Sequence, residues 1–599
     1  MIKRLLALAS SIALAVSLWA IPARRMTQIV KQPDGTSISI TLQGDEHFHY
    51  LSTTDGLPLF RTATGSYCYA TISGNTLKPS SVVAHEASLR TEDELHFISQ
   101  SVPTTAALGT LRQKRLQTDT RSCARRQPMM RSTVADAVNK TSQTIANILG
   151  QHKGLVILVN FKDEKMQSQH TLQAFDDQFN LEGYNVNGNS GSVHDYFKEQ
   201  SYGQFDLTFD VVGPVTVSKN MAAYGANDSN GNDKNPAGMV YEAVKLAKKQ
   251  NPNLNFKDYD WNNDGYVDQV YVIYAGYGEA SDVDGTLTNT IWPHEWELQA
   301  GGYFLEIDGV KVNTYGCSSE LMGNTYYPVM MDGIGSACHE FSHCLGLPDI
   351  YDTSGNNTAA FGMDFWSLMD YGCYGGDGYS PVAYTSYERW MSGWLTPKEL
   401  TQPTSIANMK ALSEAPDAYI IYNDAYPDEY YMLENRQQTG TDAEAPGHGL
   451  LVLHIDYEAS AWKNNEVNNV KSHQRCSIIP ADNKLTSGTL AGDPFPGTSH
   501  KTQLTDNSTP IAKLFHANTS DKKLMSKPIT DISESATGLI TFNFMGGSST
   551  TGITHTSLSN NAANTSPVYD AAGRYIGIMN NSTFDKARQN SGSWLIKRR

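Results

Sequence analysis

Residues 335–352 read GSACHEFSHCLGLPDIYD, and the interpretation of the whole chain begins with this stretch. His339 and His343 are four positions apart, so on a helix of 3.6 residues per turn they lie on one face, one turn apart. Two imidazoles at this spacing can bind one zinc ion. Glu340 follows the first histidine, where it can reach a metal-bound water as a general base. The stretch therefore predicts a helix that carries a zinc site.

A third metal ligand is expected after this helix, because catalytic zinc sites usually take three protein ligands and keep one position open. Gly346 can end the helix and turn the chain back toward the metal. Asp349 follows three residues later, and a carboxylate is a good zinc ligand. Asp352 is the rival carboxylate, and the alternative is that residues 347–352 form only a turn. The spacing favours Asp349.

A second stretch, FWSLMDYG at residues 365–372, contains the pattern S-x-M-x-Y. In zinc peptidases with an extended histidine motif, a methionine-containing turn of this kind lies beneath the metal. We expect Met369 in that turn and the Tyr371 hydroxyl where it can stabilise a developing oxyanion. A buried core methionine is the commoner explanation of such a Met. The pattern gains weight because it follows the histidine motif in the same chain.

Residues 258–268, DYDWNNDGYVD, place oxygen-bearing groups at alternate positions. Ca²⁺ requires such oxygens around a sharp turn, which Gly265 supplies. The expected calcium ligands are Asp260, Asn262, Asp264, the carbonyl of Tyr266, and Asp268. Position 12 of the loop is Tyr271 rather than the bidentate glutamate of an EF-hand, so the loop is closer to shorter bacterial calcium loops. The alternative is a plain Asn/Asp/Gly hairpin turn.

Taken together, these stretches resemble the immune-inhibitor-A-like family of secreted metallopeptidases. The resemblance runs from about residue 150 to 460 and rests on GSVHDYFKEQSYGQF, DGYVDQVYVIYAGYGE, IWPHEW, GIGSACHEFSHCLGLPDIYD, WSLMDYG and GHGLLVLHIDY. It implies a zinc endopeptidase of metzincin-like architecture, made as a latent precursor, in which His339 and His343 bind zinc and Glu340 is catalytic. Metzincins usually carry a third histidine where this chain has Asp349, so that ligand is inferred from the spacing.

The composition is that of a secreted globular protein. Among 599 residues, 46 Lys and Arg stand against 62 Asp and Glu, which gives a formal net charge of −16. Nucleic-acid binding needs a basic surface, so we expect no nucleic-acid partner. Residues 1–20 combine a basic start, an apolar run and a small Ala20, which is typical of a secretory signal peptide cut after Ala20. The run is short for a membrane span, and we expect no span elsewhere.

Changes of pattern along the chain predict a multidomain protein. We expect a signal peptide (1–20), a β-rich propeptide (21–131) ending in an exposed basic linker (111–131), an α+β zinc metallopeptidase catalytic domain (132–400), a β-sandwich-like domain (401–546), a linker (547–565) and a C-terminal sorting-like tail (566–599). The propeptide alternates Ile38, Ile40 and Leu42 as in a strand, whereas the catalytic range combines a buried-strand run at 154–161 with a helical pattern at 236–250.

The seven cysteines are an odd number for a secreted chain and too few for a disulfide scaffold. Cys338 and Cys344 would lie about 9 Å apart along one helix, so they should not bond to each other. Cys317 and Cys373 are candidate partners, with buried free thiols as the equal alternative. Cys123 can be considered as a thiolate cap on the zinc of a precursor, although it lacks a recognisable switch motif.

These patterns favour a secreted or cell-surface zinc metalloendopeptidase that acts on protein or peptide substrates. The alternative is a calcium-stabilised surface adhesin or binding protein with an inactive protease domain, which the retained Glu340 argues against. A structural-zinc protein is a weaker interpretation, because structural sites usually have four ligands and are rich in cysteine. The tail, from VYDAAGRYIG to SGSWLIKRR, resembles the sorting tails of type-nine secretion substrates, which implies recognition by that secretion system. The alternative for the tail is a small β-hairpin.

Overall fold

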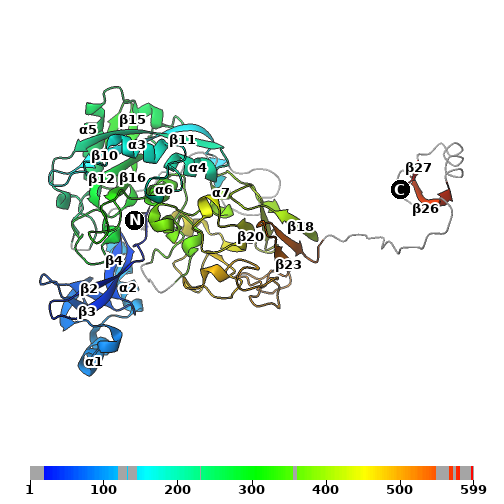
Figure 1. Ribbon diagram of the computed structural model, residues 1–599, viewed down its shortest axis with the longest axis horizontal. Coiled ribbons are helices and arrows are strands. Elements are labelled where there is room, and N and C mark those ends of the chain that lie inside the picture. The colour runs from blue at the N-terminus through cyan, green and yellow to red at the C-terminus, as the bar shows by residue number, and fades with distance from the viewer. Residues whose placement is uncertain are drawn as a thin grey trace, which may run out of the picture. The chain divides into compact units, whose positions relative to one another are not determined.

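The computed structural model describes residues 19–118, 131–132, 145–146, 148–228, 231–354, 360–547, 565–570, 575–580 and 595–597. The chain divides into two compact units, Met1–Ser548 and Ser549–Arg599, which are described separately below. Most of the expected signal peptide, most of the expected linkers, and Cys123 lie outside the described residues. The first unit mixes helices with several sheets (Figure 1), in agreement with the predicted combination of helix and strand.

The N-terminal region is an antiparallel meander. Its strands pair in chain order, as β2 (Thr27–Lys31), β3 (Ser37–Asp45), β4 (Phe48–Thr53), β5 (Pro58–Arg61), β6 (Tyr67–Ser73) and β7 (Thr76–Val83). Ile38, Ile40 and Leu42 are all buried on one face of β3, as their alternation predicted. Gly56 turns the chain between β4 and β5 with a φ of 85°, a conformation that glycine adopts without steric cost.

Two helices follow the meander and correct one prediction. They are α1 (Glu92–Ser101) and α2 (Thr105–Thr118). Residues 111–118 are therefore helical and do not belong to an exposed linker. Leu108 and Leu111 are buried in a small core with side chains of the meander, and the Arg112 guanidinium forms a buried ion pair with Asp45 at 2.7 Å. The segment is helical and partly buried despite its basic composition, because burial of Leu108 and Leu111 stabilises it and Asp45 neutralises the charge of Arg112.

The central sheet of the first unit has the strand order β1-β13-β16-β12-β10-β11. The bounds are β1 (Trp19–Ala20), β10 (Gly150–Asn160), β11 (Phe205–Thr216), β12 (Val270–Tyr277), β13 (His294–Glu297) and β16 (Thr314–Leu321). β11, β10, β12 and β16 run parallel, whereas β13 is antiparallel to β16 and β1 is antiparallel to β13. The predicted buried strand at 154–161 is the body of β10, which is buried on both faces like other parallel strands between helices.

Helices cover both faces of the central sheet (Figure 1). They are α3 (Leu172–Asn180), α4 (Val193–Gln200), α5 (Pro236–Gln250) and α6 (Ile334–Cys344). On one face, Val240 of α5 shares a core with Ile157 of β10. On the other face, Phe197 of α4 and Phe341 of α6 share a core with Val156 of β10. All of α6 from Ile334 to His343 is buried, so this helix lies in the interior. A hairpin of β14 (Leu305–Ile307) and β15 (Val310–Val312) and the short pair β8 (Arg131–Ser132) and β9 (Ile145–Ala146) complete this part.

The C-terminal part of the first unit contains two further sheets. One has the order β17 (Lys398–Glu399), β19 (Ala418–Tyr422), β20 (Glu429–Arg436), β21 (Gly449–Asp456) and β22 (Cys476–Ile478), and the other β18 (Thr404–Met409), β24 (Ile540–Phe544) and β23 (Ile529–Glu534). Leu433 and Val452 of the larger sheet share a core with Phe542 of the smaller one. Met432 and Leu453, on the opposite face, belong to the same core as α6. Two short helices, α7 (Ser386–Met391) and α8 (Ala459–Lys463), lie in this part of the chain.

The second unit contains a small antiparallel sheet of β26 (Tyr575–Asn580), β25 (Thr565–Asp570) and β27 (Leu595–Lys597), in that order. Among the described residues, no helix has the length and apolar character needed to cross a membrane. Cys317 and Cys373 are both free and buried, so the disulfide considered for them is wrong and the alternative of buried thiols is correct. Cys338 and Cys344 are also free, as expected from their separation on α6.

Candidate metal centre

Three buried side chains converge beside the C-terminal half of α6. His339 Nε2 lies 3.1 Å from Asp349 Oδ1, and His343 Nε2 lies 3.4 Å from the same oxygen. All three side chains are fully shielded from solvent. Donor atoms around a tetrahedral zinc ion are about 3.3 Å apart when the zinc–ligand distances are about 2.0–2.1 Å. The spacing therefore suits one zinc ion held by the three side chains.

The chain that follows α6 returns Asp349 to the histidines. The helix ends at Cys344, and Gly346 has a φ of 98°, a conformation that residues with a side chain rarely adopt. Asp352 instead accepts a hydrogen bond from the backbone N–H of Ser354 at 2.8 Å and lies outside the converging group. Of the two rival carboxylates, the structure brings Asp349 and not Asp352 to the histidines.

The protonation of the group also suits a metal. Burial lowers the pKa of His343 to about 4, so its imidazole is neutral at physiological pH. Burial alone would raise the pKa of Asp349, but the contacts with His343 and His339 lower it well below its ordinary value. A neutral imidazole and an ionised carboxylate are the forms of these side chains that bind metals.

Each histidine has a second contact that fixes its ring. The Nδ1 of His339 is 2.8 Å from the carbonyl oxygen of Leu368, and the Nδ1 of His343 is 2.8 Å from the carbonyl oxygen of Leu347. An Nδ1–H that donates to a carbonyl leaves the Nε2 lone pair available to a metal. Both rings are therefore held in the tautomer and orientation that zinc binding requires.

Asn465 orients the carboxylate of Asp349. Its Nδ2 donates to Asp349 Oδ2 at 2.6 Å, and its Oδ1 accepts from the backbone N–H of Asp349 at 2.8 Å. The two residues are 116 positions apart in the chain, and Asn465 lies just after α8. Sequence analysis missed this residue, because a single asparagine in the polar stretch KNNEVNN belongs to no motif and only the tertiary fold brings it to the site.

The stretch predicted to form a methionine turn contacts the histidine motif through its backbone. Met369 is buried, and its carbonyl accepts from the backbone N–H of Ile350 at 2.8 Å. Its own N–H donates to Ser367 Oγ at 3.0 Å, while Ser367 donates to the Glu388 carboxylate at 2.5 Å. The carbonyl of Leu368, in the same turn, holds His339. The turn therefore supports the first histidine through its backbone.

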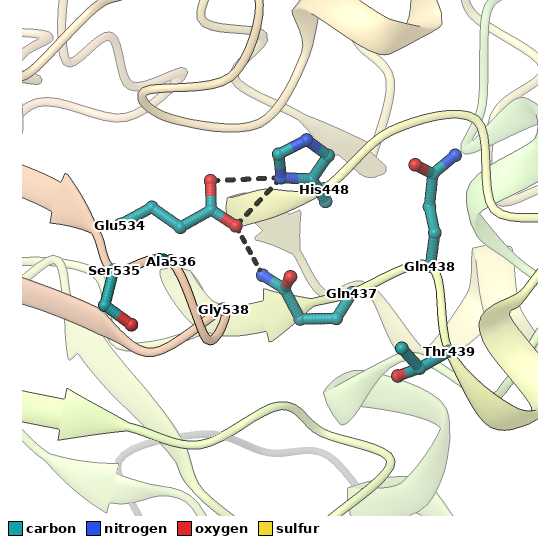
Figure 2. A pocket seen from close by; sticks show the side chains of 8 residues that line it. All are labelled: Gln437, Gln438, Thr439, His448, Glu534, Ser535, Ala536 and Gly538. Atoms are coloured by element: carbon teal, nitrogen blue, oxygen red, sulfur yellow. Dashed lines mark hydrogen bonds and ion pairs between the residues drawn. The ribbon is translucent and has the colours of Figure 1, made fainter.

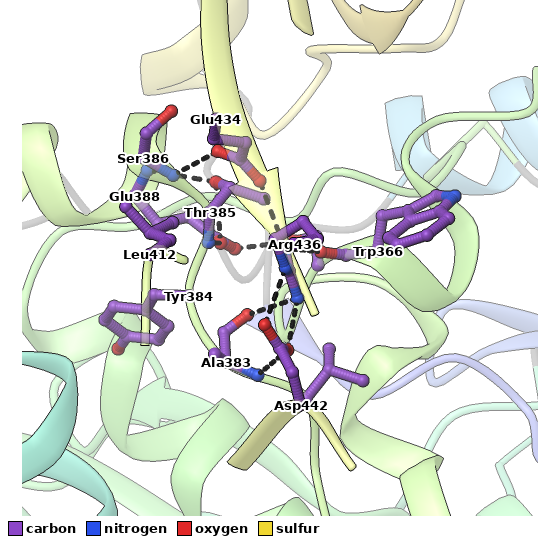
Figure 3. Close-up of polar contacts among 12 residues, drawn as sticks. Trp366, Ala383, Tyr384, Thr385, Ser386, Glu388, Leu412, Glu434, Arg436 and Asp442 are labelled. Carbon is purple, nitrogen blue, oxygen red and sulfur yellow. Dashed lines mark hydrogen bonds and ion pairs between the residues drawn. The ribbon is translucent and has the colours of Figure 1, made fainter. Parts of the chain in front are cut away.

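A buried arginine ties this turn to the larger C-terminal sheet (Figure 3). Arg436, at the end of β20, donates to the carbonyl oxygen of Trp366 at 3.1 Å and forms ion pairs with Asp442 and Glu434. Glu434 also accepts from the backbone N–H of Ser386, the first residue of α7. Buried charges are stable only when they are paired, so this network fixes the turn relative to β20.

Glu340 is buried beside the converging group. Burial raises the pKa of its carboxyl well above the ordinary value, and the negative charge of Asp349 raises it further. The Oε1 accepts a hydrogen bond from the backbone N–H of Ile21 at 2.9 Å. Within the part of the chain that the structure describes, Oε2 has no hydrogen-bond partner. A carboxylate with one oxygen available at a metal site is suited to accept a proton from water.

The first described residues pass through this site as an extended strand. Ala20 of β1, the outermost strand of the central sheet, pairs with His294 of β13. Three side chains donate to successive backbone carbonyls of the segment: Tyr351 to Ala20 at 2.5 Å, Trp292 to Ile21 at 3.0 Å, and Tyr374 to Pro22 at 2.7 Å. Binding through the main chain along a sheet edge is the way that many proteins hold extended peptides.

Tyr371 contacts the same N-terminal segment. It lies at the first position of a short 3-10 helix, Tyr371–Gly378, two residues after Met369. The guanidinium of Arg25 is 3.3 Å from the centre of the Tyr371 ring and pairs with Asp364 at 2.8 Å. Burial raises the pKa of the Tyr371 hydroxyl, so the group is protonated and able to donate a hydrogen bond at neutral pH.

The loop predicted to bind calcium bends at Gly265, where φ is 87°. The Asp260 carboxylate accepts from the backbone N–H groups of Asp264 at 3.1 Å and Gly265 at 2.9 Å, and Asp268 accepts from Trp261 N–H at 2.7 Å. Asn262 and Asp264 make similar contacts with the next N–H groups of the loop. These are the contacts of an Asn/Asp/Gly turn. Among the described residues, the loop is not a place where His, Cys, Asp or Glu side chains converge closely enough to hold a metal ion together.

A separate surface pocket of about 440 Å³ lies in the C-terminal region (Figure 2). Its lining consists of Gln437, Gln438, Thr439, His448, Glu534, Ser535, Ala536 and Gly538. The Glu534 carboxylate crosses the pocket to His448 Nδ1 at 2.8 Å and Gln437 Nε2 at 2.8 Å. None of these residues belongs to the converging group on α6, so the pocket is distinct from the candidate metal centre.

Comparison with known proteins identifies the region that contains this centre. Residues 145–398 match the family described as immune inhibitor A peptidase M6, catalytic domain. This region of the chain is similar to the immune inhibitor A family of metallopeptidases. This M6 region contains His339, Glu340, His343 and Asp349, and the resemblance drawn from the sequence is thereby confirmed.

Two relatives of this immune inhibitor A region extend the comparison. The pre-pro-metalloprotease PrtV of Vibrio cholerae serotype O1 is 29% identical over 272 residues, which are 40% of this chain and 29% of that protein. Immune inhibitor A of Bacillus thuringiensis subsp. alesti is 28% identical over 267 residues, 39% of this chain and 38% of that protein. The chain thus matches only about a third of the length of these relatives.

Proposed function

We propose that this protein is a secreted zinc-dependent endopeptidase, made as a latent precursor, that hydrolyses peptide bonds in protein or peptide substrates. The convergence of His339, His343 and Asp349 beside Glu340, within the region that matches the M6 family, carries the proposal. A zinc ion bound there would supply a Lewis acid that polarises a peptide carbonyl and acidifies a water molecule. The alternative of an adhesin with an inactive protease domain is not favoured by the comparisons.

Proton transfer, oxyanion stabilisation and substrate positioning are assigned to residues of the chain. Glu340 accepts the proton of the attacking water on its available Oε2 and returns it to the leaving amine. Tyr371 donates its hydroxyl hydrogen bond to the developing oxyanion. The substrate lies extended along β13, in the position that β1 occupies in this structure. Binding through the edge strand would orient the scissile carbonyl without restricting the substrate's side chains.

The proposed latency of the precursor rests on the N-terminal segment, from Ile21 to Arg25. Ile21 and Pro22 remain after the predicted removal of residues 1–20. The backbone N–H of Ile21 contacts the proposed base, and Trp292 and Tyr374 donate to the carbonyls of Ile21 and Pro22. Arg25 anchors the segment through Asp364 and the face of Tyr371. We expect Arg25→Glu, which repels Asp364, to shorten the lag before the purified precursor becomes active. Arg90→Glu, which breaks an ion pair with Asp55 within the N-terminal region, is the matched control. Equal lags for both variants and the wild type would contradict this role.

The remaining features of the proposal rest on the sequence. We propose a propeptide over 21–131, a metzincin-like catalytic domain over 132–400 and a sandwich-like domain over 401–546, with two sheets sharing one core in support of the last. A calcium ion in the loop 260–268 is proposed from its alternating oxygens. Secretion is proposed from the signal-peptide pattern at 1–20, and recognition by a secretion system from the tail at 566–599.

The decisive experiment compares wild type with Glu340→Gln in casein hydrolysis and in zinc content. Glutamine is nearly isosteric but cannot accept the proton of the water, so proteolysis should be lost while one zinc ion stays at the three ligands. A chelator should abolish the wild-type activity, and added zinc should restore it. Full activity of Glu340→Gln with unchanged metal content would refute the mechanism, and casein left intact by a processed, zinc-loaded wild type would favour the adhesin.

A further inference from the structure

A second group of side chains that could bind a metal converges at the end of β21 in the larger C-terminal sheet. Asp456 ends β21, His473 lies in the loop before β22, and His516 lies in the segment that precedes β23. His473 Nε2 is 2.5 Å from Asp456 Oδ2, while His516 Nε2 is 3.2 Å from Oδ1 and 3.3 Å from Oδ2. The donor atoms all lie within 4.8 Å of one another. Three segments that are distant in sequence thus present two imidazoles and a carboxylate to one point.

The two imidazole rings are held by aromatic faces. Tyr426 stacks on His516 with ring centres 3.8 Å apart, and Phe515 packs on His473 with ring centres 4.0 Å apart. The backbone N–H groups of Phe515 and His516 also donate to the carboxylate of Glu429, at 2.5 and 3.0 Å. Contacts through ring faces and backbone leave the ring edges oriented toward Asp456. The site is therefore arranged before any ion binds.

The carboxylate of Asp456 has one oxygen that the protein does not satisfy. The side chain is fully buried, and within the described residues its Oδ1 has no hydrogen-bond partner, although His516 Nε2 is close. Oδ2 contacts Arg475 at 3.2 Å. Leaving a buried carboxylate oxygen without a hydrogen bond costs stability, and a cation at Oδ1 would remove that cost. Arg475 then remains on the other oxygen and orients the carboxylate, as partners beyond the metal commonly do.

We propose that Asp456, His473 and His516 bind a second divalent transition-metal ion with a structural role. Two imidazoles and one carboxylate suit Zn²⁺ better than Ca²⁺ or Mg²⁺, which prefer oxygen ligands. The side chains of His473 and His516 are 32% and 36% exposed, so an ion from solvent can reach them. The evidence for this ion does not rest on the proposed peptidase activity, because none of its ligands belongs to the first site.

The second ion would anchor the loop that supports the first site. His473 stands near one end of this loop, and Asn465, which orients Asp349, stands at the other. Between them, Asn468 donates to the carbonyl oxygen of Ile350 at 2.6 Å. Fixing His473 to β21 through a metal therefore restricts the loop that holds the third ligand of the catalytic centre. Loss of the second ion should weaken zinc binding at the first.

Metal counting on the full chain tests the proposal. The protein is stripped with a chelator, reloaded with excess Zn²⁺, freed of unbound ion by gel filtration, and analysed for zinc per chain. We expect about two zinc ions in the wild type and about one in His516→Phe, which keeps the ring on Tyr426 but removes its nitrogen. His448→Phe, at an exposed histidine paired with Glu534, is the control and should keep both ions.

A second measurement distinguishes loss of the site from loss of the fold. Stepwise addition of Co²⁺ to the stripped His343→Ala variant should still give the visible absorption of one ligated cobalt, and His343→Ala/His516→Phe should give none. If the double variant loses the cobalt absorption while its circular dichroism spectrum stays unchanged, the fold is intact and the absorption belongs to the group of Asp456, His473 and His516. A wild type that takes up one zinc ion, with the same count in His516→Phe, would overturn the proposal and leave the group as ion pairs between histidines and Asp456.

Discussion

Replacing Asn465 by glycine should show how much the hydrogen bonds to Asp349 contribute to zinc binding while Asp349, the proposed ligand, is kept. Asn465 has a φ of 56°, a left-handed conformation that alanine would adopt at a cost of about 1 kcal/mol. Glycine adopts it freely, so Asn465→Gly removes the side chain without straining the loop. The change deletes both hydrogen bonds to Asp349, at 2.6 Å to its carboxylate and 2.8 Å from its backbone N–H. Asp349 itself stays in place.

The expected size of the effect follows from these two contacts. A hydrogen bond to a charged group contributes about 1.5–3 kcal/mol, and a neutral one about 1 kcal/mol. Without its amide partner, the buried carboxylate can rotate away from the histidines before zinc binds. Partners beyond the metal commonly change metal affinity by about 10–100-fold, which corresponds to about 1.4–2.7 kcal/mol. We therefore expect the zinc Kd of Asn465→Gly to rise by about 10–100-fold, with activity restored at saturating zinc.

The assay is competition for Zn²⁺ with a chromophoric chelator at fixed pH, together with activity measured against free zinc. Asn468→Ala is the control, because Asn468 holds the same loop through the carbonyls of Ile350 and Cys476 and touches no ligand side chain. It should lower the melting temperature while leaving the zinc affinity of the catalytic centre within a factor of about 10. A zinc Kd in Asn465→Gly equal to that of the wild type would refute the assigned role of Asn465.

Three further predictions test other parts of the molecule. Asp349→Ala should lose zinc to a chelator far more readily than Asp352→Ala, as checked by metal analysis after dialysis, and the reverse order would make Asp352 the ligand. Removing calcium should lower the melting temperature by a few degrees if the loop 260–268 binds it, since an ion that binds only the folded state stabilises it by mass action, and a melting temperature that calcium does not change would exclude the site. Burial raises the pKa of Asp493 to about 8, although its Oδ2 accepts from Trp366 Nε1. The folded state therefore keeps a proton that the unfolded state loses above about pH 4, and stability falls as the pH rises toward 8. Asp493→Asn should remove this fall and gain on the order of a few kcal/mol over wild type near pH 9, and parallel denaturant midpoints from pH 5 to 9 would contradict it.

The sequence could predict those parts of the fold and site that are local in the chain. The positions of the α6 histidines on one face follow from helical periodicity, which a short window of sequence is enough to show. A glycine directly after the helix likewise predicts a turn, and Gly346 has a φ of 98° in the structure. The strand alternation of β3 and the buried run of β10 were visible for the same reason.

Long-range partners could not be predicted in this way. Asn465 carries no local signal, because its importance comes from a contact across 116 positions. The helical state of residues 111–118 was missed because Arg112 reads as a surface charge until Asp45 is known to face it. A charged residue is usually taken to be exposed, but a buried ion pair places it in the interior, and only the tertiary structure shows such a pair.

The larger C-terminal sheet has a practical consequence for recombinant work on this protein. The match to the M6 catalytic domain ends at residue 398, which invites production of a shortened chain that stops near that point. Such a chain would lack β20 and β21, whose Met432 and Leu453 complete the core around α6. It would also lack Asn465 and Arg436. Stopping there would expose an apolar surface beside the proposed zinc ligands, so the shortened chain should aggregate or bind zinc weakly. Inactivity of that shortened chain would then say nothing about the proposed activity of the full chain.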